Sequence, residues 1–300
     1  MTPITKILCP IDFSEFSRHA LDHAIGIAKR YQASVTALYV IPPITTWYPP
    51  TDIAAYIPYV YTAEELAELQ RSVERFVAES ESIYPVTAVS VEAPVVREIL
   101  DRIQTMPADL LVLGTHGRSG FERVVLGSVT ERILAKANCP VLTVPRRNPD
   151  VVPFGRVLYP HILCPVDFSS SSLRALAYAG DLARETGARL TALHVLEPIS
   201  RFQPVMMGGQ NAPEFHQFER NDARERLRDA MPSAVRDATS FSELVIDGRP
   251  WEETIRIAAE RDVSLIAMGA HAGPASVFGF GSTTNRVVRE AVCPVLTLRA

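Results

Sequence analysis

The chain has 300 residues, of which 47% are hydrophobic and 21% charged, and its formal net charge is −4. This balance suits a globular protein with room for two domains of about 150 residues, and it shows no basic excess that would favour nucleic acid. No segment reaches the ~18 apolar residues that a membrane-spanning helix needs, and the first residues lack the apolar stretch of a signal peptide, so we expect no membrane association and a cytoplasmic location.

The first half of the chain predicts alternating strands and helices. Residues 6–11 (KILCPI) form a short apolar run, and Ser14 then offers a helix N-cap to a segment with apolar residues at helical spacing. Residues 34–41 (SVTALYVI) are rich in β-branched and aromatic side chains, which favour a strand. The later elements are expected as a helix over 64–80, a strand over 86–92, a helix over 97–104, a strand over 109–114, a helix over 128–137 and a strand over 140–144.

The second half repeats the first. Residues 7–43 align without a gap on residues 162–198, at an offset of 155 residues and with roughly half the positions identical. A period this long indicates two copies of one domain. Prolines and a glycine between 145 and 160 mark the linker, so we place the domains at residues 1–151 and 152–300. The expected fold class is α/β: two tandem doubly wound domains, each a five-stranded parallel sheet with helices on both faces.

The cysteines predict no metal site. Cys9, Cys139, Cys164 and Cys293 form two equivalent pairs, each residue followed by proline, and none has a second ligand at zinc-binding spacing. We therefore expect small buried thiols.

The chemistry of the first half is expected after its fourth strand. Two residues separate Gly114 from Gly117, nine residues separate Gly117 from Gly127, and Ser128 opens the last helix. Glycine allows backbone to approach a ligand closely, and the amide groups at a helix start attract phosphate. A side chain at Gly127 would then intrude where backbone approaches phosphate.

Other residues are expected beside this loop. In a doubly wound sheet, ligands bind beyond the carboxyl ends of the strands where the strand order reverses. This rule brings Pro10, Asp12 and Val40, at the ends of the first two strands, next to the glycine loop. A nucleotide is expected to span them.

These segments resemble the universal stress protein family in its tandem two-domain form, over nearly the whole chain. The resemblance rests on PIDFS and PVDFS after the first strands, on LGTHGRSG, on Gly127-Ser128 and on CPVLTV. It implies ATP as ligand, with or without Mg, and contacts from Asp12 and the backbone around Val40 to adenine or ribose. The residues it implies around the ribose and phosphates are Gly114, His116, Gly117, Gly127, Ser128, Val129 and Thr130.

The resemblance also implies how the halves associate. Members of the family pair through their last strand, so we expect the two halves to pair with each other, and a homodimer of the whole chain stays open. No protein partner is indicated.

The second half departs from the glycine pattern. Its loop, residues 269–282, has Ala272 at the place of the second glycine and is one residue shorter. The residues that keep the rest of the pocket are Asp167, Val195, Gly269, Gly281 and Ser282. The second site is therefore expected to be weaker, altered in geometry or empty.

Each candidate residue also has a structural interpretation. Ser128 and Glu131 form an S-x-x-E capping box, and Asp12 suits a turn at the start of the first helix. His116 has no metal ligand at suitable spacing.

Three classes of function stay open. The leading one is an ATP-binding regulatory or stress-tolerance factor without efficient turnover, with no catalytic residue assigned. The alternatives are a slow ATPase or phosphotransferase that uses Ser128 or Thr130, and a nucleotide-free interaction scaffold. A Walker A string is absent.

Overall fold

The computed structural model describes most of the chain, namely residues 3–43, 45–47, 56–80, 86–116, 126–145, 158–197, 212–270 and 281–299. The elements of the first half are β1 (Lys6–Ile11), α1 (Glu15–Tyr31), β2 (Ser34–Ile41), β3 (Thr45–Trp47), β4 (Tyr56–Pro58), α2 (Ala63–Ala78), β5 (Val86–Glu92), α3 (Val95–Thr105), β6 (Leu110–Gly114), α4 (Ser128–Lys136) and β7 (Val141–Val144). The strands and helices for which the sequence analysis gave residue ranges agree with these elements.

The second half follows the same order. Its elements are β8 (His161–Pro165), α5 (Ser170–Thr186), β9 (Arg189–Leu196), α7 (Ala212–Ala230), α8 (Ser233–Arg236), β10 (Ser240–Asp247), α9 (Pro250–Glu260), β11 (Leu265–Ala270), α10 (Ser282–Glu290) and β12 (Val295–Arg299). No helix in the described part of the chain combines the length and apolar character needed to cross a membrane.

Polar caps fix where the helices begin. Ser14 is the N-cap of α1, as expected, and its hydroxyl accepts a hydrogen bond from the Ser17 amide at 3.2 Å. Ser169 caps α5 in the same way. At the other end of α5, Gly187 adopts a φ of 75°, the left-handed conformation in which a residue without Cβ avoids strain.

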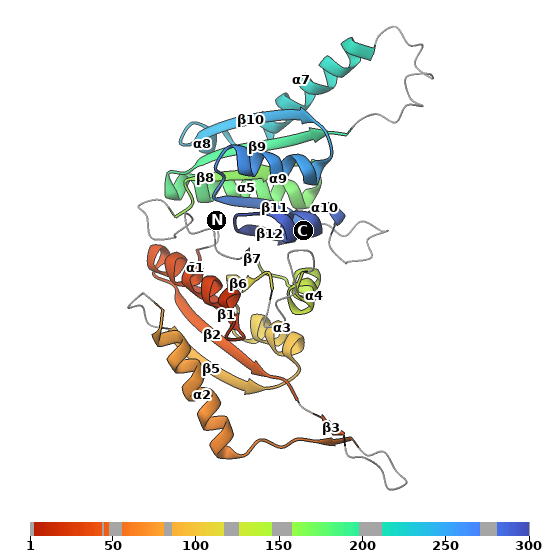
Figure 1. Cartoon of the computed structure of the whole chain (residues 1–300). Coiled ribbons are helices and arrows are strands. Elements are labelled where there is room, and N and C mark those ends of the chain that lie inside the picture. The colour runs from red at the N-terminus through yellow and green to blue at the C-terminus, as the bar shows by residue number, and fades with distance from the viewer. Residues whose placement is uncertain are drawn as a thin grey trace.

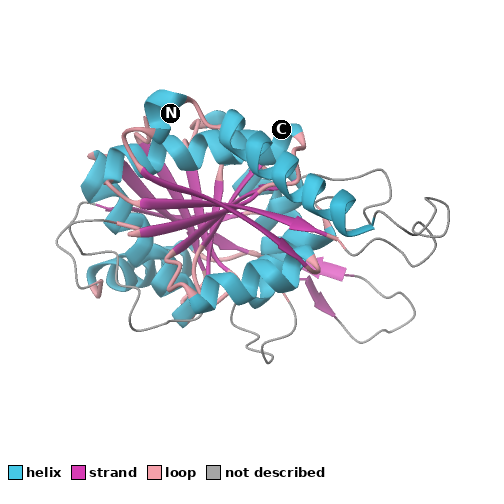
Figure 2. Ribbon diagram, turned by 90° about the horizontal axis from the view of Figure 1, so that it is seen from above, coloured by secondary structure: helices cyan, strands magenta, loops and turns pink. Residues whose placement is uncertain are grey.

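One ten-stranded sheet runs through both halves, in the order β10-β9-β8-β11-β12-β7-β6-β1-β2-β5. Within each half the strands are parallel, and helices cover both faces of the sheet (Figures 1 and 2). This arrangement confirms the predicted fold class. The hydrophobic core consists of two clusters that each include residues from both halves, so the halves share their core.

The halves meet through their last strands, which confirms the expected pairing. β7 and β12 are antiparallel, and Leu142 lies directly opposite Leu296. Two buried threonines exchange equivalent hydrogen bonds across this pair: Thr143 donates to the Val295 carbonyl at 3.1 Å and Thr297 to the Val141 carbonyl at 3.2 Å. Because the two strands run in opposite directions, the carboxyl ends of the two parallel sets lie at opposite edges of the sheet.

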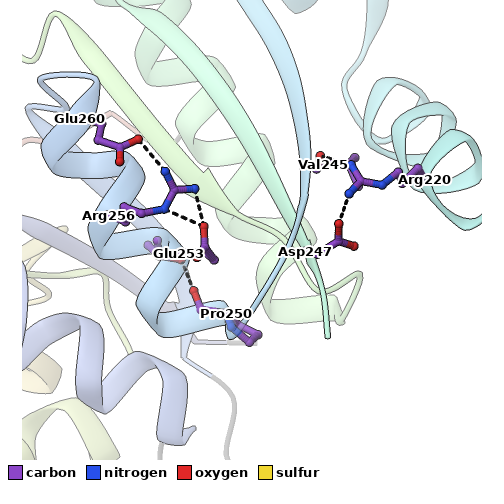
Figure 3. Close-up of polar contacts among 8 residues, drawn as sticks. Arg220, Val245, Asp247, Pro250, Glu253, Arg256 and Glu260 are labelled. Carbon is purple, nitrogen blue, oxygen red and sulfur yellow. Dashed lines mark hydrogen bonds and ion pairs between the residues drawn. The ribbon is translucent and has the colours of Figure 1, made fainter. Parts of the chain in front are cut away.

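Two features were not expected from the sequence. β3 and β4 form a separate antiparallel pair within the long connection after β2. In the second half, α7 is held to the outer strand β10 by Arg220, which donates to the Val245 carbonyl and to the Asp247 carboxylate (Figure 3). The expected domain boundary between residues 151 and 152 lies outside the described residues.

Candidate functional site

The ends of β2, β1 and β6 lie side by side at one edge of the sheet. β1 pairs with β2 up to Ile11 and Tyr39, and with β6 through Ile7 and Leu110. The strand order of the first half reverses between β1 and β6, so this is the switch point at which doubly wound sheets bind ligands. Pro10 and Val40 lie at the carboxyl ends of β1 and β2, as expected.

Asp12 shapes the turn between β1 and α1. Its Oδ1 accepts hydrogen bonds from the Ser14 amide at 3.1 Å and from the Ser14 hydroxyl at 2.5 Å. Between these residues, Phe13 adopts a φ of 64°, which is uncommon for a residue with a bulky side chain. The turn interpretation of Asp12 therefore holds for one carboxylate oxygen.

Gly114 has a packing role at the end of β6. A Cβ added there would lie 2.8 Å from the Phe16 Cβ and 3.0 Å from the Phe16 carbonyl carbon. The next residues continue this contact, because the His116 ring lies 5.1 Å from the Phe16 ring and its Nδ1 lies 3.0 Å from the Thr115 hydroxyl. The small size of Gly114 thus lets α1 approach β6.

The start of α4 corrects the capping-box interpretation. Gly127, not Ser128, is the N-cap, and no side chain caps this end. Ser128 is the first helical residue, and its side chain is exposed beside that of Val129. The first intrahelical hydrogen bond runs from the Glu131 amide to the Gly127 carbonyl at 2.9 Å, so three amide groups precede the hydrogen-bonded ladder.

Thr130 and Gly127, which were expected near phosphate, also have contacts within the protein. The buried hydroxyl of Thr130 donates to the Gly114 carbonyl at 2.9 Å and so fastens α4 to β6. A Cβ added at Gly127 would lie 3.3 Å from the Thr115 carbonyl oxygen and 3.6 Å from the His116 Cα. A side chain at Gly127 would therefore press on the protein's own backbone as well as on the proposed phosphate position.

The second half builds the same junctions at the opposite edge. The Asp167 Oδ1 accepts from the Ser169 amide at 2.9 Å and from its hydroxyl at 2.5 Å, and Phe168 has a φ of 63°. Burial raises the pKa of Asp167, but hydrogen bonds from Ser169 and Ser172 outweigh it and hold the pKa below its usual range. Val195 lies near the end of β9.

The last helix of the second half also begins at a glycine. Gly281 is the N-cap of α10, Ser282 is the exposed first residue, and Thr284 donates to the Gly269 carbonyl at 3.0 Å. The first turn of α10 contains no acidic residue, whereas the first turn of α4 contains Glu131.

Comparison with known proteins assigns the family. The sequence model of the universal stress protein family matches residues 3–145 and again residues 158–299. The chain belongs to the universal stress protein family. It is 26% identical to a universal stress protein of Mycolicibacterium smegmatis over 98% of this chain and 96% of that protein.

Two further universal stress proteins resemble one half and the whole of this chain, respectively. A universal stress protein of Methanocaldococcus jannaschii is 37% identical over 46% of this chain and 81% of its own length. The crystal structure of a universal stress protein from Archaeoglobus fulgidus has a TM-score of 0.67 and 21% identity, and the match covers 98% of this chain and 96% of that one. At 21% identity, the match to the Archaeoglobus fulgidus structure shows a similar fold and no more.

Some predicted residues of this universal stress protein lie outside the described residues. They are Gly117 in the first half and Ala272 in the second. The loop comparison between the halves therefore stays a prediction. Among the described residues, no group of three or more His, Cys, Asp or Glu side chains gathers where it would hold a metal ion.

Sequence reasoning missed the residues that support the site. Phe16 packs under Gly114 and His116, and Phe13 stands against Tyr39 with ring centroids 4.6 Å apart. The repeated Asp-Phe-Ser segment was the available signal for Phe13. No sequence pattern shows that its backbone is left-handed, because that conformation depends on the strand and helix that it joins.

Proposed function

We propose that this universal stress protein binds an adenine nucleotide, with ATP as the expected ligand, at the carboxyl edge of its first half. We further propose that occupancy regulates a stress-tolerance function without efficient turnover. The observation that carries the proposal is the start of α4, where three amide groups and the exposed Ser128 lie next to the end of β6. Amide groups and the positive end of a helix dipole favour phosphate.

The base and ribose would lie toward β1 and β2. Asp12 and the backbone of Val40 stand at neighbouring strand ends, and a carboxylate accepts hydrogen bonds from amino or hydroxyl groups. Family membership supports this assignment. It also supports contacts to the nucleotide from the other first-half residues, namely Pro10, Gly114, His116, Gly117, Gly127 and Val129. In the second half, Asp167, Val195, Gly269, Gly281 and Ser282 would form a weaker counterpart.

The first test is nucleotide release on denaturation. Protein purified without added nucleotide is denatured, and the released compound is identified and counted per chain. We expect up to one molecule of adenine nucleotide per chain, bound in the first half. Protein that neither carries adenine nucleotide nor binds it in a titration would favour the scaffold alternative.

Ser128→Asp provides a sharper prediction. A carboxylate at the first position of α4 should repel phosphate and lower ATP affinity at least about tenfold, while its interaction with the helix dipole stabilises the fold by about 0.5 kcal/mol. Calorimetric titration measures the affinity, and thermal unfolding verifies the fold.

The matched control is Ser282→Asp, at the exposed start of α10. We expect a smaller loss of total binding from this variant, because the complete glycine spacing occurs in the first half only. Unchanged ATP affinity in Ser128→Asp would refute the proposed phosphate position. A larger loss in Ser282→Asp would assign the tighter site to the second half.

ATP hydrolysis is expected to be far slower than about 1 per second, because the proposed site lacks an assigned general base and metal ligands. Thr130 is a poor candidate for phosphotransfer, since its hydroxyl is buried and donates to Gly114. Multiple-turnover phosphate release measures the rate. Sustained turnover at an ordinary enzymatic rate that disappears in Ser128→Ala would establish the enzyme alternative instead.

A further inference from the structure

A histidine and a tyrosine from different halves meet inside the joint between them. His23 lies on α1, and Tyr159 lies in the segment just before β8. The His23 Nδ1 and the Tyr159 hydroxyl are 3.0 Å apart, and the two rings stack with an interplanar angle of 10°. Only 6% of His23 and 3% of Tyr159 is exposed to solvent. The contact is therefore a buried polar link between the halves.

The neighbourhood of this link is apolar. Tyr159 lines a hollow of 20 Å³ between the halves, together with Ile4, Ile27, Leu158 and Leu182. This volume is that of about one water molecule, and the mostly apolar lining offers such a water few polar partners. Because only 6% of His23 is exposed, a charged imidazole there would have little access to water in the closed joint.

Burial and a neighbouring histidine both oppose protonation of His23. Burial, and to a lesser extent the neighbouring His19 on the same helix, lower the pKa of His23 to about 4. Near Tyr159 lie Cys293 and Tyr31, which add to the effect of burial in raising the pKa of the tyrosine. Burial raises the pKa of Tyr159 well above its usual value and that of Cys293 to about 12, so neither supplies a negative charge at neutral or acidic pH.

We propose that the His23–Tyr159 contact is an acid-sensitive latch between the two halves, closed while the imidazole is neutral and released when it takes a proton. Because the closed joint binds this proton less readily than the open one, the latch is fully closed above about pH 6.5. It is lost progressively as the pH falls toward 4. The proposal is independent of nucleotide binding.

Hydrogen exchange measured by mass spectrometry tests the latch on the full chain. Exchange at pH 7.5 and 4.5 is compared after correction for the intrinsic pH dependence of the rates. From the lowered pKa, closure of the joint should weaken by about 70-fold at pH 4.5. The amides of residues 158–165 and 19–27 should therefore lose protection in acid in the wild type and keep it in His23→Leu.

Two further variants keep the test decisive. If His23→Leu does not fold, His23→Gln provides a neutral side chain that still forms hydrogen bonds. His161→Gln is the matched control, because burial also lowers the pKa of His161, but its ring contacts Thr191 and Arg261 within the second half. His161→Gln should keep the acid response at the joint. Equal acid responses in the wild type and the His23 variant, or a loss spread evenly over β2 and β9, would overturn the latch.

Discussion

Leu142→Lys is expected to lower the free energy of unfolding by about 5 kcal/mol, which is as large as the whole stability of many domains. Leu142 lies in the middle of the ten-stranded sheet, opposite Leu296, and only 2% of it is exposed. The longer lysine would overpack this site and place an ammonium group in a core that both halves share. Most molecules should then lose the pairing of β7 with β12.

Urea unfolding and analytical ultracentrifugation measure this effect as lost stability and lost compactness. Leu296→Lys should behave alike, because the two leucines are equivalent across the joint. Val292→Lys is the control: this valine is 50% exposed, so its replacement should change stability by less than about 0.5 kcal/mol. Wild-type stability in both leucine variants would show that the halves do not depend on this pairing.

Gly269→Ala is expected to cost about 3 kcal/mol or more, although it adds a single methyl group. The added Cβ would lie 2.6 Å from the Ser171 carbonyl carbon and 2.6 Å from the Ser172 nitrogen. Both atoms are backbone of the first turn of α5, so the helix itself must move away from β11. Chemical denaturation measures the loss in unfolding free energy.

Gly180→Ala is the matched comparison within the same half. Its Cβ would approach the Met231 Sδ at 2.8 Å and the Val235 Cγ1 at 3.0 Å, which are side-chain atoms that can shift. Alanine in the interior of α5 also favours the helix by about 1 kcal/mol. We therefore expect a net change near zero. If both variants lost equal stability, the close approach of backbone at Gly269 would not be the cause.

Much of the fold was predictable because its signals are local. The apolar run before Pro10, the N-cap at Ser14 and the alternation of strand and helix patterns all depend on residues within one or two turns of each other. The internal repeat then predicted the second half, and the equivalent last strands predicted where the halves meet.

One failed prediction and one missed contact concern local details whose meaning depends on distant residues. Ser128 matches the first residue of a capping box, yet the N-cap of α4 is Gly127, whose amide donates to the Thr115 carbonyl at 3.0 Å. Gly114 packs against Phe16 of α1, a contact that the sequence did not show, and its contact with a ligand stays a prediction. Both outcomes follow from how closely α1 and α4 pack on the end of β6.

Sequence patterns predicted the two-domain repeat, the order of strands and helices, and the glycines and Ser128 at the edge where a nucleotide is proposed. Apolar periodicity depends on neighbouring residues, so it is visible in the sequence whichever fold buries the apolar face. The packing of the folded chain was needed to show that the halves share one core and that His23 meets Tyr159 within it. Contacts between residues more than a hundred positions apart leave no local pattern, because they depend on how complete layers pack against each other.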